Sequence, residues 1–450
     1  EESIVNAAEL LLVERVRELA RGGFAERAAA TDRERAFPAK NVDELRTLGV
    51  TSMLLDPKYG GLGMGPEALV SVMEEIAWAD GSTAVALNMH LLIAHFLSFL
   101  PMPMFPHGEK VLTDMGRNAA LICGPGSVPT GDLDNRKSGF TFSEQGDAFI
   151  VNGKAGFASM SEGATYALVG GWIDRTGSEP NVVVAAPRLD SPGIRNLRNW
   201  NAMGMRGTAS HDIAIEGLVI PRSEAFVLPL SLARAGQRQM TVEMIKQRSW
   251  GALGILGIWV GLSQAAYDAT LAYVKERHGY LAGATAGTAE VGFRADEAWA
   301  QTGIGRMDHW LATGRIVLRD TVRGLSETGE DAQAFTRRTG VDADTALREI
   351  ASLLTDLESY AAYFLLDARL FAEYAKWPAP SREALLETLV ASKRPAFLEI
   401  PFNVISEHMS VFRESLAAGV KGFVVAPPGW LSPSSSTSWL ERAAGRTRRS

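Results

Sequence analysis

The sequence is poor in disulfide-forming and metal-binding side chains. Its 450 residues include one cysteine, Cys123, and seven histidines. One cysteine cannot form a disulfide within the chain. A cysteine content this low is typical of proteins in a reducing compartment, and we therefore expect a cytoplasmic protein. The same count excludes cysteine-based zinc sites, and the histidines lack the spacing of a ligand set, so we expect no metal.

Two long stretches lack charge. Residues 81–108 and 249–267 contain no Asp, Glu, Lys or Arg, and each approaches the length of a membrane span. Polar side chains and prolines interrupt the first stretch, and charged amphipathic segments surround both, so we expect buried helices and no membrane span. The opening Glu1-Glu2-Ser3 lacks the basic start of a secretory signal.

The overall charge does not favour nucleic-acid binding. The formal net charge is -7, from 45 Lys and Arg against 52 Asp and Glu. An acidic chain offers no electrostatic footprint for a polyanion, so we expect no nucleic-acid partner. With 46% hydrophobic residues the composition is that of a globular protein, and the length suggests about three domains.

Residues 1–118 have the spacing of helices, and we expect an N-terminal helical domain. Apolar residues recur three and four apart over residues 4–19. Pro66 suits the first turn of a helix that runs to Asp80. Ser82 is expected to cap the uncharged helix that follows.

Residues 119–228 change to a period of two, and we expect a β domain of hairpins. Phe140 and Phe142, then Phe149 and Val151, alternate around a polar turn. Asn152-Gly153 predicts a second hairpin turn. Further strands are expected over 166–169, 181–184 and 213–215.

Helical spacing returns near Thr241, and we expect residues 229–425 to form a C-terminal helical bundle. Long helices are predicted over 294–328, 343–377 and 381–400. Four glycines lie three and four apart and predict a close helix–helix contact; no strand precedes them, as a phosphate loop would require. These glycines are Gly251, Gly254, Gly257 and Gly261. Residues 426–450 form a divergent Pro/Ser-rich and basic tail.

Five motifs occur in a fixed order along residues 30–320. They are Asp56–Gly63 with the following Glu74-Glu75-Ile76-Ala77, Gly153-Lys154-x-x-Phe157-x-Ser159, Trp200–Ser210, Tyr273–Arg277 and Gln301–Met307. Their sequences and order resemble the acyl-CoA dehydrogenase family of flavoproteins. The resemblance implies an α+β fold with an N-terminal α-helical domain, a middle β-barrel-like domain and a C-terminal four-helix bundle.

The resemblance also implies an FAD that lies between the β domain, the bundle and a neighbouring subunit of a homodimer or homotetramer. Phe157 would supply a flat apolar wall, Ser159 a hydrogen bond to a ring edge, and Arg277 a fork of donors to the diphosphate. The residues implied to bind the cofactor are Ser127, Thr130, Phe157, Ser159, Arg277 and Gln301. Without the family, the commoner interpretation is that Phe157 is a strand core residue and that Arg277 is a solvated helix end. With the family, the two interpretations of Phe157 are even, and the cofactor contact is favoured for Arg277.

The sequence departs from the family where catalysis needs a carboxylate. Family dehydrogenases remove an α-proton with a glutamate, found in a C-terminal segment or, in a minority, on the first bundle helix. The corresponding stretches here, about 426–438 and 247–251, contain no acid. The family's flavin-binding loop is replaced by Gly124–Asp132, in which Ser127, Thr130 and backbone groups remain as ligands.

Three functions follow from this pattern. The first is α,β-dehydrogenation of an acyl thioester, carried by CoA or a carrier protein, with an electron-transfer partner. The second is a monooxygenase on the same scaffold, for which the cofactor would be FMN. It needs reduced flavin, a flavin reductase, oxygen and a dry pocket but no base. The third is a non-catalytic or partner-dependent member of the family. The catalytic and substrate-binding residues stay unassigned.

Three histidines have competing interpretations. His90 and His95 lie on an apolar helix that, by analogy with the family, lines the acyl pocket, but satisfied core histidines are commoner at such positions. His211 follows the Trp200–Ser210 motif and either approaches a ligand or caps a turn.

Overall fold

The computed structural model describes residues 7–126, 139–173, 180–232, 242–280 and 291–330, and two strands at 397–401 and 422–426. The chain divides into two compact units, Glu1–Leu354 and Thr355–Ser450. In the second unit the structure describes β12 (Phe397–Pro401) and β13 (Gly422–Ala426), which pair in parallel. The predicted helix over 381–400 is therefore wrong at Phe397–Ile400, where a β-prone run lies between Pro395 and Pro401. The predicted helix over 343–377 lies outside the described residues.

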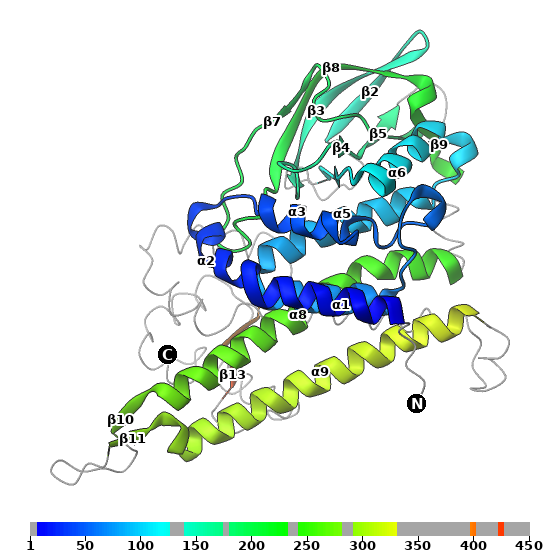
Figure 1. The fold of residues 1–450 in the computed structure, drawn as a ribbon. Helices are drawn as coiled ribbons and strands as arrows, with labels where there is room; N and C mark the ends of the chain where they lie inside the picture. The colour runs from blue at the N-terminus through cyan, green and yellow to red at the C-terminus, as the bar shows by residue number, and fades with distance from the viewer. Residues whose placement is uncertain are drawn as a thin grey trace, which may run out of the picture. The chain divides into compact units, whose positions relative to one another are not determined.

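Helices make up the described chain before residue 119 (Figure 1). They are α1 (Ala7–Leu19), α2 (Ala25–Glu34), α3 (Ala39–Thr47), α4 (Pro66–Ala79), α5 (Gly81–Ser98) and α6 (Pro106–Asn118), with a π-helical turn, Ala20–Phe24, between α1 and α2. Pro66 begins α4, as predicted. The cap of α5 is Asp80 rather than Ser82, because the Asp80 carboxylate accepts a hydrogen bond from the Ser82 backbone N–H at 2.9 Å.

The uncharged helix α5 is buried on most of its length, as predicted. Its residues Ala84, Leu87 and Leu91 join the core formed by α1, α3 and α4. Ala94 and Leu97 join a second core that includes α6 and residues of the sheet domain, such as Tyr166. In the part of the chain that the structure describes, no helix has the length and hydropathy needed to cross a membrane.

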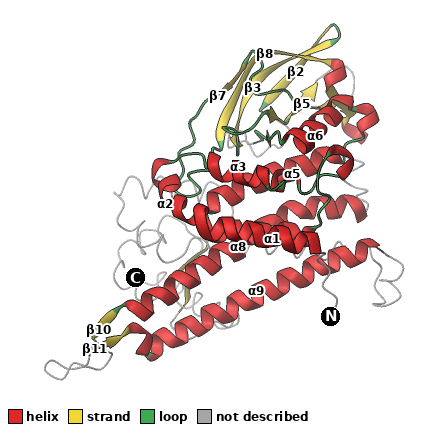
Figure 2. Ribbon diagram, viewed as in Figure 1, coloured by secondary structure: helices red, strands yellow, loops and turns green. Residues whose placement is uncertain are grey.

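Strands follow from β1 to β9 (Figure 2). Seven of them form a mixed sheet in the order β7-β8-β3-β2-β5-β6-β9, in which β2 and β5 are parallel and the other pairs antiparallel. The strands are β2 (Phe140–Gln145), β3 (Ala148–Ala158), β5 (Val169–Ile173), β6 (Asn181–Ala185), β7 (Ile194–Asn196), β8 (His211–Pro221) and β9 (Ala225–Pro229). A separate parallel pair joins β1 (Ile122–Cys123) to β4 (Tyr166–Ala167). Cys123 is buried there, and burial raises the pKa of its thiol to about 12.

The hairpin turn predicted at Asn152-Gly153 is wrong. The β2–β3 turn lies at Gly146-Asp147, between the paired residues Gln145 and Ala148. Asn152 and Gly153 lie inside β3, at a register shift against β8. There the Asn152 side chain accepts a hydrogen bond from the Gly217 N–H at 2.8 Å, so a turn-forming pair serves as a bulge.

Two long helices, α8 (Val242–Glu276) and α9 (Ala298–Glu330), follow the sheet and are joined through the β10–β11 hairpin (His278–Tyr280 and Val291–Phe293) (Figure 1). The glycines of α8 lie in close helix contacts, as predicted. A Cβ at Gly251 would lie 2.6 Å from Leu92 of α5, and a Cβ at Gly257 would lie 2.7 Å from the Val70 carbonyl of α4. Gly254 and Gly261 approach Asn88 and the Glu74 carbonyl even more closely.

Candidate functional site

Backbone strain is concentrated where β3 ends and β8 begins. The register of these strands shifts between Ala155 and Ala158. Seven described residues other than glycine have positive φ, and five of them lie here: Phe157 (57°), Met160 (74°), Arg198 (47°), Met205 (53°) and Ala209 (47°). Each such residue costs about 1–3 kcal/mol, and such strain clusters at functional sites. The turn after β3 and the 197–210 loop are therefore our candidate site.

An aromatic pair, Phe157 and Trp200, lies at the centre of this region, and we call it the aromatic wall. Phe157 is 62% exposed although it lies in a strand. The ring of Trp200 meets it edge to face, with centroids 5.3 Å apart and planes at 70°. The Trp200 indole N–H donates to the Met205 carbonyl at 3.1 Å, so the ring is fixed within its own loop. An exposed, fixed aromatic surface is suited to a flat ligand.

A chain of three buried hydroxyls follows the wall. Thr208 Oγ1 donates to the Met205 carbonyl at 3.0 Å. Because each hydroxyl has one proton, Ser210 then donates to Thr208 at 2.7 Å and Ser159 donates to Ser210 at 2.8 Å. Ser159 is consequently left with lone pairs that accept hydrogen bonds from a ligand.

The loop of the site is anchored on the helical domain. The Gly207 N–H donates to Ser82 Oγ at 3.2 Å, so the side chain expected to cap α5 holds the loop instead. A Cβ at Gly81 would lie 3.1 Å from both the Met205 and Leu262 side chains. The first turn of α5 thus meets α8 and the strained loop at one point.

His211 lies at the start of β8 and ties the loop to the turn after β3. Its Nδ1 accepts from the Trp200 backbone N–H at 2.8 Å, and its Nε2 is 2.8 Å from Glu162 Oε1. The sequence left two interpretations, approach to a ligand or capping of a turn. The structure is nearer to the second, because His211 binds the backbone of the 197–210 loop.

The residues implied to bind the cofactor fall into three groups. Phe157 and Ser159 lie together at the candidate site. Arg277 directly follows α8, and Gln301 lies in the first turns of α9, beside the far end of α8. There the Arg277 carbonyl accepts from Arg294 N–H at 2.8 Å, and Gln301 donates to the Ala295 carbonyl at 2.9 Å. Arg277 lies roughly 22 Å along the helix from Leu262. One chain therefore does not bring them to Phe157, and their role stays a prediction for an oligomer. Ser127 and Thr130 lie outside the described residues.

No carboxylate lies at the family's alternative base position on the first bundle helix. Residues 247–251 are helical in α8. Trp250 stacks on His95 of α5, with centroids 4.2 Å apart and planes at 16°, and Gly251 faces Leu92. Neither nitrogen of the His95 ring has a hydrogen-bond partner in the described chain. Burial lowers its pKa to about 4, so the imidazole is neutral near pH 7.

His90 is a satisfied core histidine, in agreement with the commoner interpretation. Its Nδ1 accepts from the Ile122 N–H at 3.0 Å, and its Nε2 donates to the Thr51 carbonyl at 2.8 Å. Desolvation by burial lowers its pKa to about 4. Both nitrogens hold the backbone, so His90 has no free group for a ligand.

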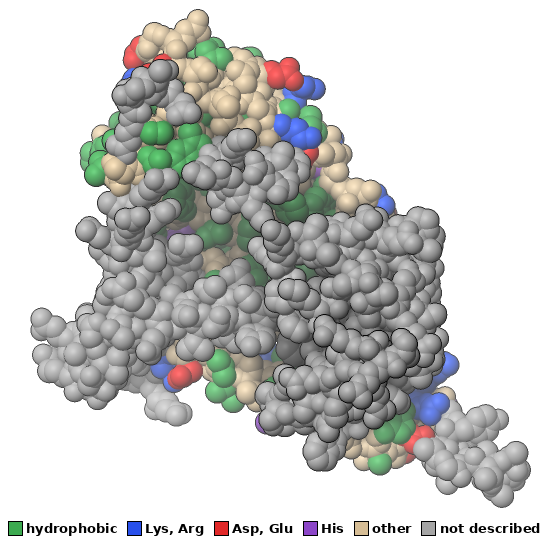
Figure 3. All heavy atoms as spheres, turned by 180° about the vertical axis from the view of Figure 1, so that it is seen from behind, with side chains coloured by type: hydrophobic (Ala, Val, Ile, Leu, Met, Phe, Trp, Pro, Cys, Tyr) green, Lys and Arg blue, Asp and Glu red, His purple; other side chains and the backbone are tan. Residues whose placement is uncertain are grey.

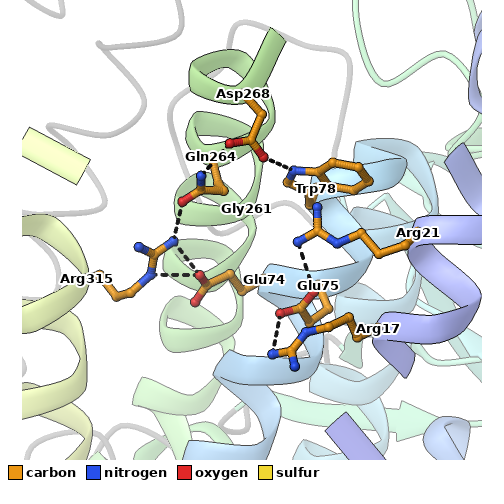
Figure 4. Close-up of a pocket in the computed structure, with 9 residues that line it drawn as sticks. All are labelled: Arg17, Arg21, Glu74, Glu75, Trp78, Gly261, Gln264, Asp268 and Arg315. Atoms are coloured by element: carbon orange, nitrogen blue, oxygen red, sulfur yellow. Dashed lines mark hydrogen bonds and ion pairs between the residues drawn. The ribbon is translucent and has the colours of Figure 1, made fainter. Parts of the chain in front are cut away.

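A polar crevice of about 210 Å³ lies between α1, α4, α8 and α9 (Figure 4). Glu74 bonds Arg315 Nε at 2.8 Å and Arg319 at 3.0 Å, and the adjacent Glu75 bonds Arg17 at 3.0 Å and Arg21 at 3.3 Å. The two glutamates thus join α4 to helices on opposite sides. Because the arginines already have carboxylate partners, we interpret the crevice as a helix clamp rather than an anion site.

One family model and several relatives agree with this architecture. Residues 6–99 match the model of the acyl-CoA dehydrogenase N-terminal domain. An amino sugar nitrososynthase of Streptomyces peucetius is 29% identical over 275 residues, which are 58% of this chain and 63% of that protein. A putative acyl-CoA dehydrogenase of Bacillus subtilis is 26% identical over 258 residues, 56% of this chain and 63% of that protein. The aligned region thus spans less than two thirds of these relatives.

A solved FMN-bound flavoenzyme from Paenibacillus sp. A11-2, a dibenzothiophene monooxygenase, has the same fold. It superposes with a TM-score of 0.67 at 17% identity and covers 91% of this chain and 94% of that one. The helical N-terminal domain, mixed sheet and helical C-terminal region therefore have the acyl-CoA dehydrogenase fold. The match to the N-terminal family model and the curated relatives support the resemblance to acyl-CoA dehydrogenases that the motifs indicated.

The described residues fit a flavin. A neutral isoalloxazine needs a flat apolar surface and a few fixed polar groups at its edge. The aromatic wall offers the surface, with Phe157 exposed, and Ser159 offers the edge group beside it. Sequence reasoning found Phe157 and Ser159 through their motif. It missed the role of Met205, whose carbonyl accepts hydrogen bonds from Trp200 and Thr208. Methionine gives no sequence signal for the positive φ that this residue adopts.

Proposed function

We propose that this chain is a flavin-dependent monooxygenase that acts on a small molecule. Reduced flavin, when bound, supplies two electrons for dioxygen, of which one oxygen atom passes to the substrate and the other leaves as water. This chemistry needs a water-poor apolar pocket but no carboxylate that removes an α-proton. The relatives and structural neighbours support the flavin chemistry and leave FAD and FMN as alternatives.

The observation that carries the proposal is that, among the described residues, no free carboxylate lies at the site. Where α5 packs against α8, Asn88 and Leu92 of α5 face glycines of α8, so this contact contains no carboxylate. In the described β domain, the acids beside the aromatic wall are engaged: Glu162 bonds His211, and Asp212 bonds Lys154 at 2.8 Å. Phe157 and Trp200 would hold the ring, and Ser159 would orient its edge.

An amine-bearing small molecule is the first substrate class to test, because the nitrososynthase relative acts on amino sugars. Hydrophobic side chains gather near the middle of the face seen from behind (Figure 3). Exposed Phe96 and Phe99 of the α5 end belong to the described apolar surface.

The second candidate is dehydrogenation of an acyl thioester. The match to the dehydrogenase N-terminal model and the 26% identity to a putative acyl-CoA dehydrogenase favour it. It requires a base from a position that the family motifs do not supply.

One experiment separates the two. The protein is loaded with reduced FMN or FAD, and amino sugars and acyl-CoA thioesters are added with ¹⁸O₂. Monooxygenase activity predicts substrate-dependent oxygen consumption and one ¹⁸O atom in the product. Bleaching of oxidised flavin by an acyl-CoA without oxygen would instead establish the dehydrogenase.

A further inference from the structure

His211 is buried, with 7% of its surface exposed, and both of its ring nitrogens are used. The Trp200 backbone N–H is only a donor, so Nδ1 accepts and carries no proton. The ring proton is therefore on Nε2, which donates to Glu162. This arrangement exists only for the neutral imidazole.

The bond to Trp200 holds a strained segment. Trp200 lies between Arg198 and Met205, which both have positive φ, and its indole forms half of the aromatic wall. The same loop is bonded to β8 through Leu197 N–H and the Asp212 carbonyl at 2.9 Å. Because strained backbone persists only where its surroundings fix it, loss of one anchor is expected to move the loop.

Three charged groups lie around His211. Glu162 faces it from the turn after β3, Asp212 is its neighbour in β8, and Lys154 of β3 pairs with Asp212. The hydrogen bond from Lys154 lowers the pKa of Asp212, which keeps that carboxylate charged. A second ring proton would be placed on Nδ1, where it faces the Trp200 N–H as donor against donor.

We propose that His211 is the positioning residue of the aromatic wall, holding Trp200 against Phe157 while neutral and releasing it when protonated. The structure thereby assigns a pH-dependent ligand surface to the Glu162–His211–Trp200 chain. Its importance for flavin rests on the proposed function, whereas the movement of Trp200 does not.

The test follows tryptophan fluorescence and near-ultraviolet circular dichroism against pH in the flavin-free protein. The signal of Trp200 is the difference between wild type and Trp200→Phe. We expect a single-proton step in wild type and none in His211→Asn, whose Oδ1 can accept from Trp200 N–H near the place of Nδ1 but does not titrate. His211→Ala is expected to show the acid form of the signal throughout the pH range. Far-ultraviolet circular dichroism establishes that each variant is folded.

His107→Asn is the matched control, because His107 lies outside the loop and its Nε2 bonds the Ala186 carbonyl. It should keep the step. A step that persists in His211→Asn, or that disappears in His107→Asn, would overturn the proposal.

A parallel titration with FMN measures the consequence for binding. Loss of one anchoring hydrogen bond predicts a dissociation constant raised about three- to tenfold on the acid side of the step in wild type, and a flat profile in His211→Asn. With FAD titrated in the same way, a fluorescence step without affinity for FMN or FAD at any pH would refute the flavin function and leave the positioning role intact. FMN affinity without a step in wild type would refute the positioning role alone.

Discussion

The close contact of α8 with α4 is open to a direct test at Gly261. A Cβ at this position would overlap the Glu74 carbonyl and lie 3.0 Å from the Ala77 side chain. A backbone carbonyl inside a helix cannot rotate away, so Gly261→Ala must push the two helices apart. The side chain of the next residue, Leu262, lies beside Gly81 together with that of Met205, so we expect the displacement to reach the strained loop of the site.

Two opposing terms set the magnitude. Alanine stabilises a helix interior relative to glycine by about 0.5–1 kcal/mol. Overpacking of a well-filled contact costs about 1–3 kcal/mol. We therefore expect Gly261→Ala to lower the free energy of unfolding by about 1–2 kcal/mol.

The control is the same substitution at Gly303 of α9, where no heavy atom lies within 4 Å of a built Cβ. Gly303→Ala should raise the free energy of unfolding by the helix-propensity difference between alanine and glycine alone, about 0.5–1 kcal/mol. Thermal unfolding of both variants checks that their stability changes have opposite signs. The expected shift is roughly 1–2 °C per kcal/mol for the unit Glu1–Leu354, at an unfolding entropy of about 2.1 cal/mol/K per residue. Equal stabilisation by both substitutions would refute the close contact.

Three further predictions follow from buried polar groups. Glu74→Gln should lower the free energy of unfolding by about 1–2 kcal/mol, because it weakens the bonds to two arginines that are each one third exposed; Asp320→Asn, at an exposed pair, should change chemical unfolding by less than about 0.5 kcal/mol. Ser82→Ala should cost about 1–3 kcal/mol in thermal unfolding, since it leaves the buried Gly207 N–H without its acceptor; an unchanged midpoint would contradict the anchor. The pKa of His95 is lowered to about 4, so the unfolded state binds its proton first and stability is lost as pH falls from 6.5 toward 4. His95→Phe should remove up to roughly 3 kcal/mol of this acid sensitivity, measured as unfolding midpoints at pH 7 and pH 4.5; equal sensitivity in both proteins would refute it.

The elements with strong local patterns were predictable. The uncharged stretch 81–108 contains α5, and the glycine spacing of 251–261 gave the close contacts of α8, because both depend on side-chain size and period alone. The motifs gave the fold family and the pair Phe157 and Ser159. Asn152-Gly153 failed because a turn-forming dipeptide also suits a bulge, and the choice depends on Gly217 of a strand far along the chain.

The geometry of the site was less predictable. Trp200 lies in a recognised motif and His211 directly follows it. Their hydrogen bond, however, depends on a loop with positive φ at Arg198 and Met205, residue types that do not indicate such a conformation. Ser82 satisfied the composition rule for a helix cap, yet Asp80 precedes it and leaves its hydroxyl for Gly207. Such choices are made by tertiary contacts, which the local sequence does not encode.

Flavin binding by wild type and Phe157→Ala tests the central claim most directly. Phe157 is 62% exposed, so its truncation removes ligand surface with little effect on the core. Titration of the folded proteins with reduced and oxidised FMN and FAD should give wild-type binding of at least one flavin. Loss of the ring predicts a dissociation constant raised about tenfold, or about 1.4 kcal/mol. Equal affinities in the two proteins would place the flavin elsewhere, and no affinity in wild type would contradict the assigned site altogether.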